Sequence, residues 1–289
     1  MSLETIIIYS PVFILILYVM ICAGYLVFHR YFIIFPSRKL TALPSDLNLK
    51  YDDVYFTTVD KVLLNGWLIN GVPEGKWKEY TILLFSGNKG AMSDFLPQMT
   101  QMTKVGFNVF LFSYRGFGKS RKKWPTEEGV YRDSEAACNF LTAEREIPLK
   151  KIIFMGQSLG CAMASYTAQN HNPFALMLEG GFPSLVKVAS RAVKWLPLKL
   201  LTRSRFETST FLKNIRCPAL VIHSNEDRAI PLSDAEDLFK AVTVKKKKVL
   251  ISGPHAKGLE SDSKNYIQAM DRFLNEILHE GDDSADSQR

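Results

Sequence analysis

The sequence predicts an α/β fold in which a mostly parallel β-sheet is covered by helices on both faces. Three observations lead to this prediction: short apolar runs alternate with helical stretches, the runs are apolar on both faces, and 47% of the 289 residues are apolar. Strands that are buried on both faces are typical of parallel sheets. One large domain with a short N-terminal appendage fits this length better than two equal domains.

The N-terminal element is an uncharged run of 24 residues, from Thr5 to Phe28. As a helix it would measure about 36 Å, enough to cross the ~30 Å hydrocarbon core of a bilayer. The alternatives are a signal peptide, which favours a basic start, and a buried core helix, which is seldom so long. We therefore predict a single-pass membrane anchor over residues 1–30. Basic residues such as Arg38 and Lys39 follow it, so the positive-inside rule places the rest of the chain on the cytoplasmic face.

A juxtamembrane linker over residues 31–50 leads to the predicted main domain, residues 51–280. Apolar runs predict strands at residues 54–59, 62–69, 81–85, 107–112, 152–155, 175–179, 219–223 and 248–252. The first two alternate around Asp60-Lys61 and predict an antiparallel hairpin. Helices are expected at 126–145, after the fifth strand, and at 264–278. The polar tail, residues 281–289, is predicted to be disordered.

The fifth strand ends in a G-x-S-x-G pattern, Gly156-Gln157-Ser158-Leu159-Gly160. A stretch of small, helix-forming residues follows at once, so Ser158 lies at the tip of a sharp strand-to-helix turn. Glycines suit the flanking positions because a Cβ there would strike the crossing strand and helix. The turn lifts the Ser158 hydroxyl out of the fold and leaves the Leu159 amide free to face a developing oxyanion. The pattern therefore predicts a nucleophilic serine.

A serine hydroxyl needs a general base, and that base needs an acid to orient it. His255 follows the last strand, and a loop that leaves the carboxyl edge there brings its imidazole to the edge that carries Ser158. Asp227, after the preceding strand, is the expected acid, with its neighbour Glu226 as the rival. Adjacent side chains diverge, so only one of the two can face His255, and we favour Asp227. The order Ser158, Asp227, His255 is that of the α/β-hydrolase fold.

The cysteines predict no metal or redox chemistry. They form no C-x-x-C pair and no metal-ligand spacing, so we expect small buried thiols, and neither a metal nor an organic cofactor. Cys161 lies one helical turn after Ser158 and is expected to pack beneath the turn. The cysteines are Cys22, Cys138, Cys161 and Cys217, and the histidines other than His255 are His29, His171, His223 and His279.

The chain resembles an α/β-hydrolase of the Bem46 type, a group of membrane-anchored serine hydrolases. The matching segments are the serine turn, the Asp227 loop with Pro231, the His255 loop and the run from Tyr114 to Ser120. The similarity extends from about residue 51 to residue 278. It implies that Ser158 is the nucleophile, that His255 is the general base and then the acid, and that Asp227 orients His255.

The resemblance also implies an oxyanion hole formed by the backbone amides of Leu159 and Asn88. The family usually has His-Gly-Asn after the third strand, where this chain has Ser86-Gly87-Asn88. A backbone amide can donate without that histidine. We therefore expect a functional oxyanion hole in which the local hydrogen bonding near Ser86 differs from that of the family. Lys89 is the alternative donor. Ser113, where the family often has Asp, is a second departure with no obvious catalytic cost.

The formal net charge of +7 suggests an anionic neighbour. The sequence has no zinc-finger or RNP-like pattern and its lysines are spread along the chain, so we expect membrane lipids as partners and no nucleic acid. Residues 182–216, after the sixth strand, are expected to form a small lid that mixes basic and apolar residues. The lid either rests on anionic headgroups and admits an acyl chain, or is a solvated helix with its apolar face on the core.

Together these features predict a serine hydrolase that cleaves carboxylic esters of lipid-like acyl substrates through an acyl-enzyme. A protein depalmitoylase, or acyl thioesterase, is the alternative within enzymes, because the same triad cleaves both kinds of bond. A catalytically silent interaction module is the alternative from another class. Three polar residues at strand ends argue against the silent module, because a retired site has no need to retain them.

Overall fold

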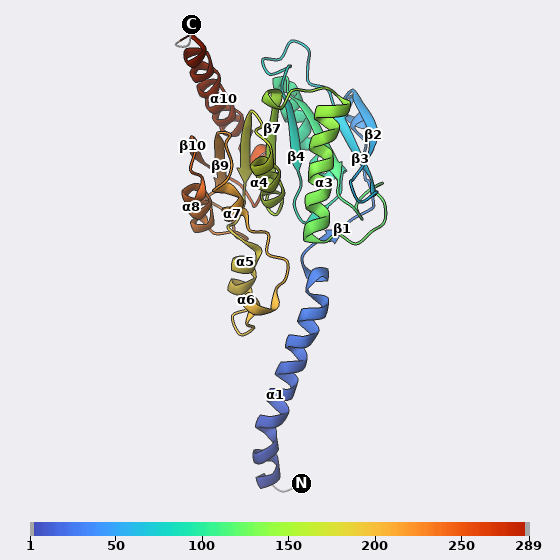
Figure 1. The fold of residues 1–289 in the computed structure, drawn as a ribbon, viewed down its shortest axis with the longest axis vertical. Helices are drawn as coiled ribbons and strands as arrows, with labels where there is room; N and C mark the ends of the chain where they lie inside the picture. The colour runs from blue at the N-terminus through green and yellow to red at the C-terminus, as the bar shows by residue number, and fades with distance from the viewer. Residues whose placement is uncertain (1–2, 287–289) are drawn as a thin grey trace.

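The computed structural model describes residues 3–286 and is built around an eight-stranded sheet in the order β10-β9-β8-β7-β4-β6-β3-β2 (Figure 1). The strands are β2 (Tyr51–Thr57), β3 (Leu63–Ile69), β4 (Thr81–Phe85), β6 (Asn108–Ser113), β7 (Ile152–Gln157), β8 (Ala175–Glu179), β9 (Ala219–Ser224) and β10 (Lys246–Ile251). β3 runs antiparallel to its two neighbours, and the other pairs are parallel. The predicted mostly parallel sheet is confirmed.

Helices cover both faces of the sheet (Figure 1). One face packs against α3 (Glu127–Asn139), α4 (Gly160–Asn170), α7 (Thr208–Leu212) and α8 (Leu232–Ala241); the other packs against α2 (Leu96–Val105) and α10 (Ser263–Asp286). β4 shows why its sequence is continuously apolar. Leu83 and Phe85 belong to the first core and Ile82 and Leu84 to the second, and all four are fully buried.

The shorter elements connect these layers. They are the strands β1 (Phe35–Pro36) and β5 (Lys89–Gly90), the helices α5 (Leu185–Ala192), α6 (Leu198–Leu201) and α9 (Gly258–Ser261), the 3₁₀ turns η1 (His29–Phe32), η2 (Pro44–Leu47), η3 (Met92–Phe95) and η5 (Leu149–Lys151), and a π-helical turn η4 (Phe140–Glu144) that continues α3. β1 and β5 form a separate two-stranded sheet that the sequence does not predict. A pair of two-residue strands has too few residues to show an alternating pattern.

Helix α10 is longer than the sequence predicts. It extends to Asp286, so residues 281–286 are helical where a disordered tail is expected, and the remaining predicted tail residues lie outside the described residues. Once a helix has formed, each added residue gains a backbone hydrogen bond at little nucleation cost. A polar segment can therefore continue a helix that is already formed.

Helix α1 (Leu3–Phe28) projects away from the body of the molecule (Figure 1). The span from Tyr9 to Phe32 has a mean hydropathy of 2.5 and none of the window that defines it is buried, so its length and composition suit a membrane-crossing helix. The chain then enters the body at Ile33 and Ile34, which are 8% and 4% exposed. The segment after α1 is therefore packed against the domain.

The predicted lid lies beside α1 (Figure 1). The Tyr18 hydroxyl donates to the Trp195 carbonyl at 3.2 Å, and the hydroxyls of Tyr25 and Thr202 are 2.9 Å apart. On the opposite side, α5 is held to α8 by a bidentate ion pair of Arg191 with buried Asp234. These contacts hold residues 182–216 between α1 and α8.

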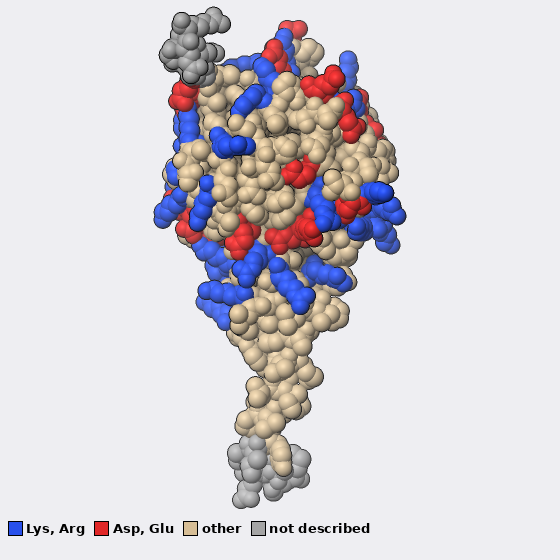
Figure 2. Space-filling view, viewed as in Figure 1, with Lys and Arg blue, Asp and Glu red and all other residues tan. Residues whose placement is uncertain are grey.

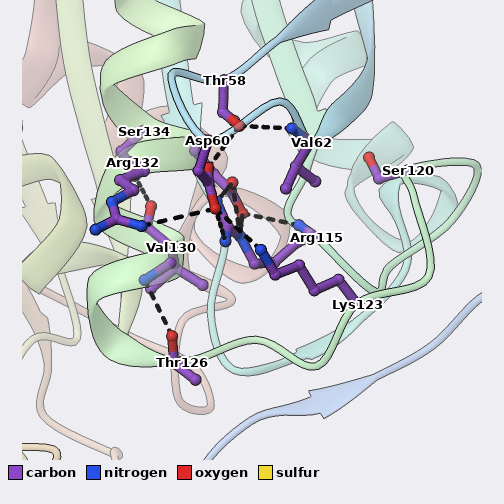
Figure 3. Close-up of polar contacts among 12 residues, drawn as sticks. Thr58, Asp60, Val62, Arg115, Ser120, Lys123, Thr126, Val130, Arg132 and Ser134 are labelled. Atoms are coloured by element: carbon purple, nitrogen blue, oxygen red, sulfur yellow. Dashed lines mark hydrogen bonds and ion pairs between the residues drawn. The ribbon is translucent and has the colours of Figure 1, made fainter.

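A buried ion cluster fixes the loop that follows β6 (Figure 3). The guanidinium of Arg115, 2% exposed, donates to both oxygens of Asp60 at 2.8 and 2.9 Å and to Asp133 at 2.7 Å. Asp60 lies in the β2–β3 hairpin and Asp133 in α3, so three elements meet at one cation. Burial raises the pKa of Asp133, against the opposing effect of the Arg115 contacts. This ion cluster holds Arg115 in place and thereby fixes the start of the loop at residues 116–120.

Candidate active site

The turn between β7 and α4 places Ser158 as the sequence predicts. Ser158 has a φ of +53°, a left-handed conformation that is strained for a residue with a Cβ. A Cβ added at Gly160 would lie 2.0 Å from the carbonyl oxygen of Phe85, and one at Gly156 would lie 2.6 Å from the Gly160 oxygen. Only glycine permits this close crossing of strand and helix. This backbone conformation places the Ser158 side chain at the carboxyl edge of the sheet.

Three polar side chains from separate loops meet at that edge. His255 Nε2 lies 2.8 Å from Ser158 Oγ, and His255 Nδ1 lies 2.5 Å from Asp227 Oδ2. An ionised Asp227 can only accept, so the proton of the ring resides on Nδ1, and Nε2 accepts from the Ser158 hydroxyl. The structure therefore brings together the three residues that the sequence singles out.

The carboxylate of Asp227 is held rigidly. Its Oδ1 accepts hydrogen bonds from the amides of Ala229 and Ile230 at 2.8 and 2.9 Å, and its side chain is 1% exposed. Burial raises the pKa of Asp227, but the hydrogen bonds from His255 and from these two amides outweigh burial and lower it below the ordinary value. The group is therefore ionised throughout the neutral range.

Glu226, the rival acid, is turned away from the histidine. Its Oε2 accepts from the Gly253 amide at 3.2 Å. That bond connects the β9 loop to the loop that carries His255, so Glu226 has a structural contact close to the site. The geometry favours Asp227 as the partner of His255.

A cavity of about 400 Å³ opens over Ser158, and most of its surface is apolar. Its walls come from the loop after β4, the start of α2 and the His255 loop. The lining residues are Gly87, Asn88, Lys89, Gly90, Asp94, Phe95, Gln98, Gln157, Ser158, His255, Ala256 and Lys257. None of them belongs to residues 182–216, so the predicted lid packs beside α1 and does not line this cavity.

The predicted oxyanion donors lie on two sides of Ser158. Leu159 directly follows the serine, and its side chain is 3% exposed. Asn88 lines the cavity, and so does the alternative donor Lys89. Within residues 3–286, no backbone carbonyl accepts a hydrogen bond from the amide of Leu159 or of Asn88. Both amides are therefore available to a ligand.

A buried polar cluster behind the serine is not predicted by the sequence analysis. Glu179, 2% exposed, accepts from Gln157 Nε2 at 2.7 Å, from the Tyr266 hydroxyl at 3.0 Å and from the Gly258 amide at 2.9 Å. Its backbone carbonyl also accepts from the Ser158 amide at 2.9 Å. Burial raises the pKa of Glu179, although these donors oppose the shift. The signal in the sequence is an acid at the end of an otherwise apolar strand.

Cys138, Cys161 and Cys217 are buried as predicted, whereas Cys22 in α1 is only partly buried, because α1 projects away from the core. His171 and His223 have contacts outside the triad. Cys161 is fully buried beneath the turn, its Sγ donates to the Gly156 carbonyl at 3.2 Å, and burial raises the pKa of its thiol. His223 Nε2 lies 3.0 Å from the Ile230 carbonyl, and His171 lies 2.7 Å from Glu135 on the surface. Among the described residues, no group of three or more His, Cys, Asp or Glu side chains is arranged to hold a metal ion.

A strained serine after a parallel strand, with a histidine and an acid on the loops after the last two strands, defines an α/β-hydrolase. Comparisons with known proteins agree. A family model described as serine aminopeptidase, S33 matches residues 78–213. The solved esterase Pf2001 of Pyrococcus furiosus superposes with a TM-score of 0.70 and 21% identity, over 84% of this chain and 97% of that one. At that identity the likeness concerns the fold.

Relatives found by sequence similarity show which family of α/β-hydrolases the chain belongs to. The chain is 30% identical to an uncharacterized protein of Mycobacterium tuberculosis over 86% of this chain and 87% of the relative. It is 32% identical to the α/β-hydrolase domain-containing protein WAV2 of Arabidopsis thaliana, over 68% of each, and 29% identical to protein bem46 of Schizosaccharomyces pombe, over 79% and 80%. The chain belongs to the Bem46-like α/β-hydrolases and is a hydrolase by family.

Proposed function

We propose that this chain is a serine hydrolase that cleaves carboxylic esters of lipid-like acyl substrates. Ser158 is the nucleophile, His255 the general base and then the general acid, and Asp227 the group that orients His255. The amides of Leu159 and Asn88 form the oxyanion hole. The observation that carries the proposal is the unbroken chain of contacts, 2.5 Å from Asp227 to His255 and 2.8 Å from His255 to Ser158.

Acylation begins when Ser158 Oγ attacks the ester carbonyl carbon while its proton moves to His255 Nε2. The tetrahedral oxyanion is stabilised by the two amides, each of which contributes about 10²- to 10³-fold to kcat in sites of this kind. Collapse breaks the bond to the leaving oxygen, which takes the proton from Nε2 and departs as an alcohol. The acyl group remains on Ser158.

Deacylation repeats the steps with water as the nucleophile. His255 Nε2 takes a proton from water, the resulting hydroxyl attacks the acyl carbon, and the proton returns to Ser158 Oγ as the carboxylic acid leaves. The negative charge of Asp227 stabilises the imidazolium in both halves of the reaction. His255 therefore carries every proton transfer, and the two amides stabilise the oxyanion in both halves of the reaction.

The substrate class is supported by the cavity and by its position. An apolar cavity of about 400 Å³ suits an acyl chain. The loop that carries Asn88 pairs through β5 with β1, which begins at Phe35, a few residues after α1. A site so close to the end of the anchor favours an ester that reaches it from the bilayer.

A panel of esters and thioesters with acyl chains of 2 to about 16 carbons tests this proposal on the full chain in detergent micelles. Each methylene buried in the cavity is expected to raise kcat/KM about four-fold, from ~0.8 kcal/mol per CH₂, until the cavity is filled. Ser158→Ala is the matched control and is expected to be inactive on every member. A kcat/KM independent of chain length would contradict a lipid-like substrate, and a preference for thioesters would favour the depalmitoylase alternative.

We also propose that α1 anchors the chain in a membrane and that the tip of the lid enters the same leaflet. The tip is apolar and open, since Trp195 is 59% and Leu200 83% exposed. Tyr18, which contacts Trp195, precedes Phe28 by ten residues, about 15 Å along the helix. Of the lid cations, Lys194 and Lys199 have no acidic partner within ion-pair distance in the described chain, and both are long enough to reach headgroups.

The distribution of charge supports this placement. Figure 2 shows blue side chains gathered around the narrow end of the body, next to the uncharged surface of α1. A basic band beside an apolar stem is the arrangement expected where anionic headgroups surround a membrane helix. The same asymmetry favours the cytoplasmic face for the domain.

The depth of the lid tip is measurable in reconstituted bilayers that contain lipids brominated in the acyl chain. Wild-type tryptophan fluorescence is expected to be quenched, and Trp195→Phe to remove most of that quenching. Trp124→Phe, which changes another exposed tryptophan that packs on Tyr31, is the matched control and is expected to retain it. Equal quenching in wild type and Trp195→Phe would show that the tip stays out of the bilayer.

The orientation has its own test. Protease added outside intact cells is expected to leave the chain beyond Arg30 undigested, because the positive-inside rule places that part in the cytoplasm. Digestion of the domain without permeabilising the cells would reverse the orientation.

A further inference from the structure

The residues that leave the membrane helix are bonded directly to the loop that presents the proposed oxyanion donor. We call Ser86–Gly90 the oxyanion loop. The Phe35 amide donates to the Asn88 carbonyl at 2.8 Å, and the Asn88 side-chain amide donates to the Ile33 carbonyl at 3.0 Å. β1 and β5 pair in parallel just beyond, Phe35 with Lys89 and Pro36 with Gly90. The carbonyl and the side chain of Asn88 are thus both held by the juxtamembrane chain, while its amide remains available.

The juxtamembrane chain is itself rigidly held. Ile33 and Ile34 are buried in the core that α3 and α4 cover. Three residues after Ile34, the Ser37 carbonyl accepts from the Gly118 amide at 2.9 Å, and Arg38 Nη1 donates to the Ser120 carbonyl at 2.9 Å. Those carbonyl and amide groups belong to the loop that the Arg115 cluster fixes. Residues 33–38 therefore connect the loop at residues 116–120, which the Arg115 cluster fixes, to the oxyanion loop.

The oxyanion loop has little support of its own. Gly87 approaches the serine closely, since a Cβ added there would lie 3.6 Å from Ser158 Cβ. On the far side the loop ends in a turn, in which Asp94 accepts from the Ala91 amide at 2.9 Å and Gly90 has a φ of +95°. Between Gly87 and that turn, the bonds recorded for the described chain run to Ile33 and Phe35. The direction of the Asn88 amide depends on them.

We propose that Ile33–Pro36 is a positioning element of the oxyanion hole and that the Asn88 side chain is a positioning residue. This inference rests on the proposed function and deepens it, because it makes the exit of the membrane anchor part of the catalytic apparatus. An oxyanion donor acts only if it is aimed where charge develops, and a misplacement of about 1 Å can cost ~10²-fold in rate. The membrane anchor and the hydrolytic centre are therefore coupled through the four residues Ile33–Pro36.

Two substitutions in the full chain, in detergent micelles with a short-chain soluble ester, test this coupling. Asn88→Ala removes the bond to Ile33 and leaves the backbone amide in place. Phe35→Pro removes the N–H that bonds the Asn88 carbonyl. Each is expected to lower kcat about 10- to 100-fold with KM changed less than about three-fold. The reason is that the Asn88 N–H would no longer point at the oxyanion, which forms only in the transition state. Lys39→Pro is the matched control, since Lys39 lies outside β1 and no acceptor is recorded for its amide within residues 3–286, and it is expected to keep kcat within about two-fold.

An inhibitor pair separates positioning from general damage. A trifluoromethyl ketone forms an adduct with Ser158 whose oxyanion occupies the hole, so its inhibition constant is expected to rise by the same factor as kcat falls. The matching methyl ketone, which binds without that charge, is expected to keep its affinity. Because Asn88→Ala changes one half-buried side chain, it carries the test if Phe35→Pro fails to fold.

The possible failures are distinct. Unchanged kcat in both variants, with a wild type that reacts with a fluorophosphonate, overturns this coupling and leaves the serine hydrolase intact. Equal losses in Lys39→Pro, or equal weakening of both ketones, also overturn it, because they indicate a structural effect. A wild type that neither hydrolyses esters nor reacts with the probe overturns the proposed function, and this inference with it.

Discussion

Replacing His255 with alanine is expected to lower kcat by about 10⁴- to 10⁶-fold, the largest single effect in the molecule besides loss of the serine. Without the imidazole, nothing within hydrogen-bonding reach on the described chain takes the proton of Ser158 Oγ, since Nε2 at 2.8 Å is the contact recorded for that hydroxyl. A neutral serine hydroxyl is a poor nucleophile. The measurement is steady-state hydrolysis of the best ester from the panel, with substrate above KM.

His171→Ala is the matched control for that substitution. His171 pairs with Glu135 at the surface and lies outside the cavity lining, so its loss is expected to leave kcat within about two-fold. A His255→Ala variant that kept more than about a tenth of wild-type kcat would remove His255 from the mechanism.

Asp227→Asn is expected to lower kcat by about 10⁴-fold, with KM little changed. The amide that replaces the carboxylate has hydrogens to donate, and it no longer stabilises an imidazolium. If its NH₂ group faces Nδ1, the ring proton is driven to Nε2, which then cannot accept from Ser158. The Asp227 carboxylate already accepts from Ala229 and Ile230 through its other oxygen, so the substitution disturbs little else.

Glu226→Gln provides the comparison, because the two acids are adjacent and only Asp227 contacts His255. Its side chain accepts from the Gly253 amide, a bond that the glutamine oxygen can also accept, so kcat is expected to stay within about three-fold. If Glu226→Gln were the damaging substitution and Asp227→Asn the mild one, the roles of the two acids would have to be exchanged.

Much of the site can be predicted because each of its residues follows a strongly patterned strand. The runs 81–85 and 175–179 match β4 and β8 residue for residue, since continuous burial on both faces leaves an unmistakable apolar signature. In a parallel sheet the ends of such strands meet at one edge, which brings Ser158, Asp227 and His255 together across 97 residues of chain. The apolar pattern of the strands and the topology of a parallel sheet are together sufficient to predict that these three residues meet.

Other features depend on contacts that the sequence does not encode locally. The pairing of β1 with β5 involves two residues on each side, and its partners are separated by 54 positions. The lid has a basic and apolar composition that fits both alternatives considered for it, and its position beside α1 is set by tyrosine contacts and by the pairing of Arg191 with Asp234. Buried Glu179 is similarly inconspicuous in the sequence, because the three donors to its carboxylate, Gln157, Gly258 and Tyr266, come from distant segments.

The most direct measurement is the site of covalent reaction with a fluorophosphonate probe. Wild-type protein in micelles is expected to gain one phosphonyl group, located by peptide mass spectrometry on Ser158, and Ser158→Ala is expected to gain none. Phosphonylation requires the hydroxyl, the imidazole and the oxyanion donors to act on one phosphorus atom, so it reports their convergence in a single event. A probe adduct on another residue, or labelling that persists in Ser158→Ala, would contradict a nucleophilic serine at the end of β7.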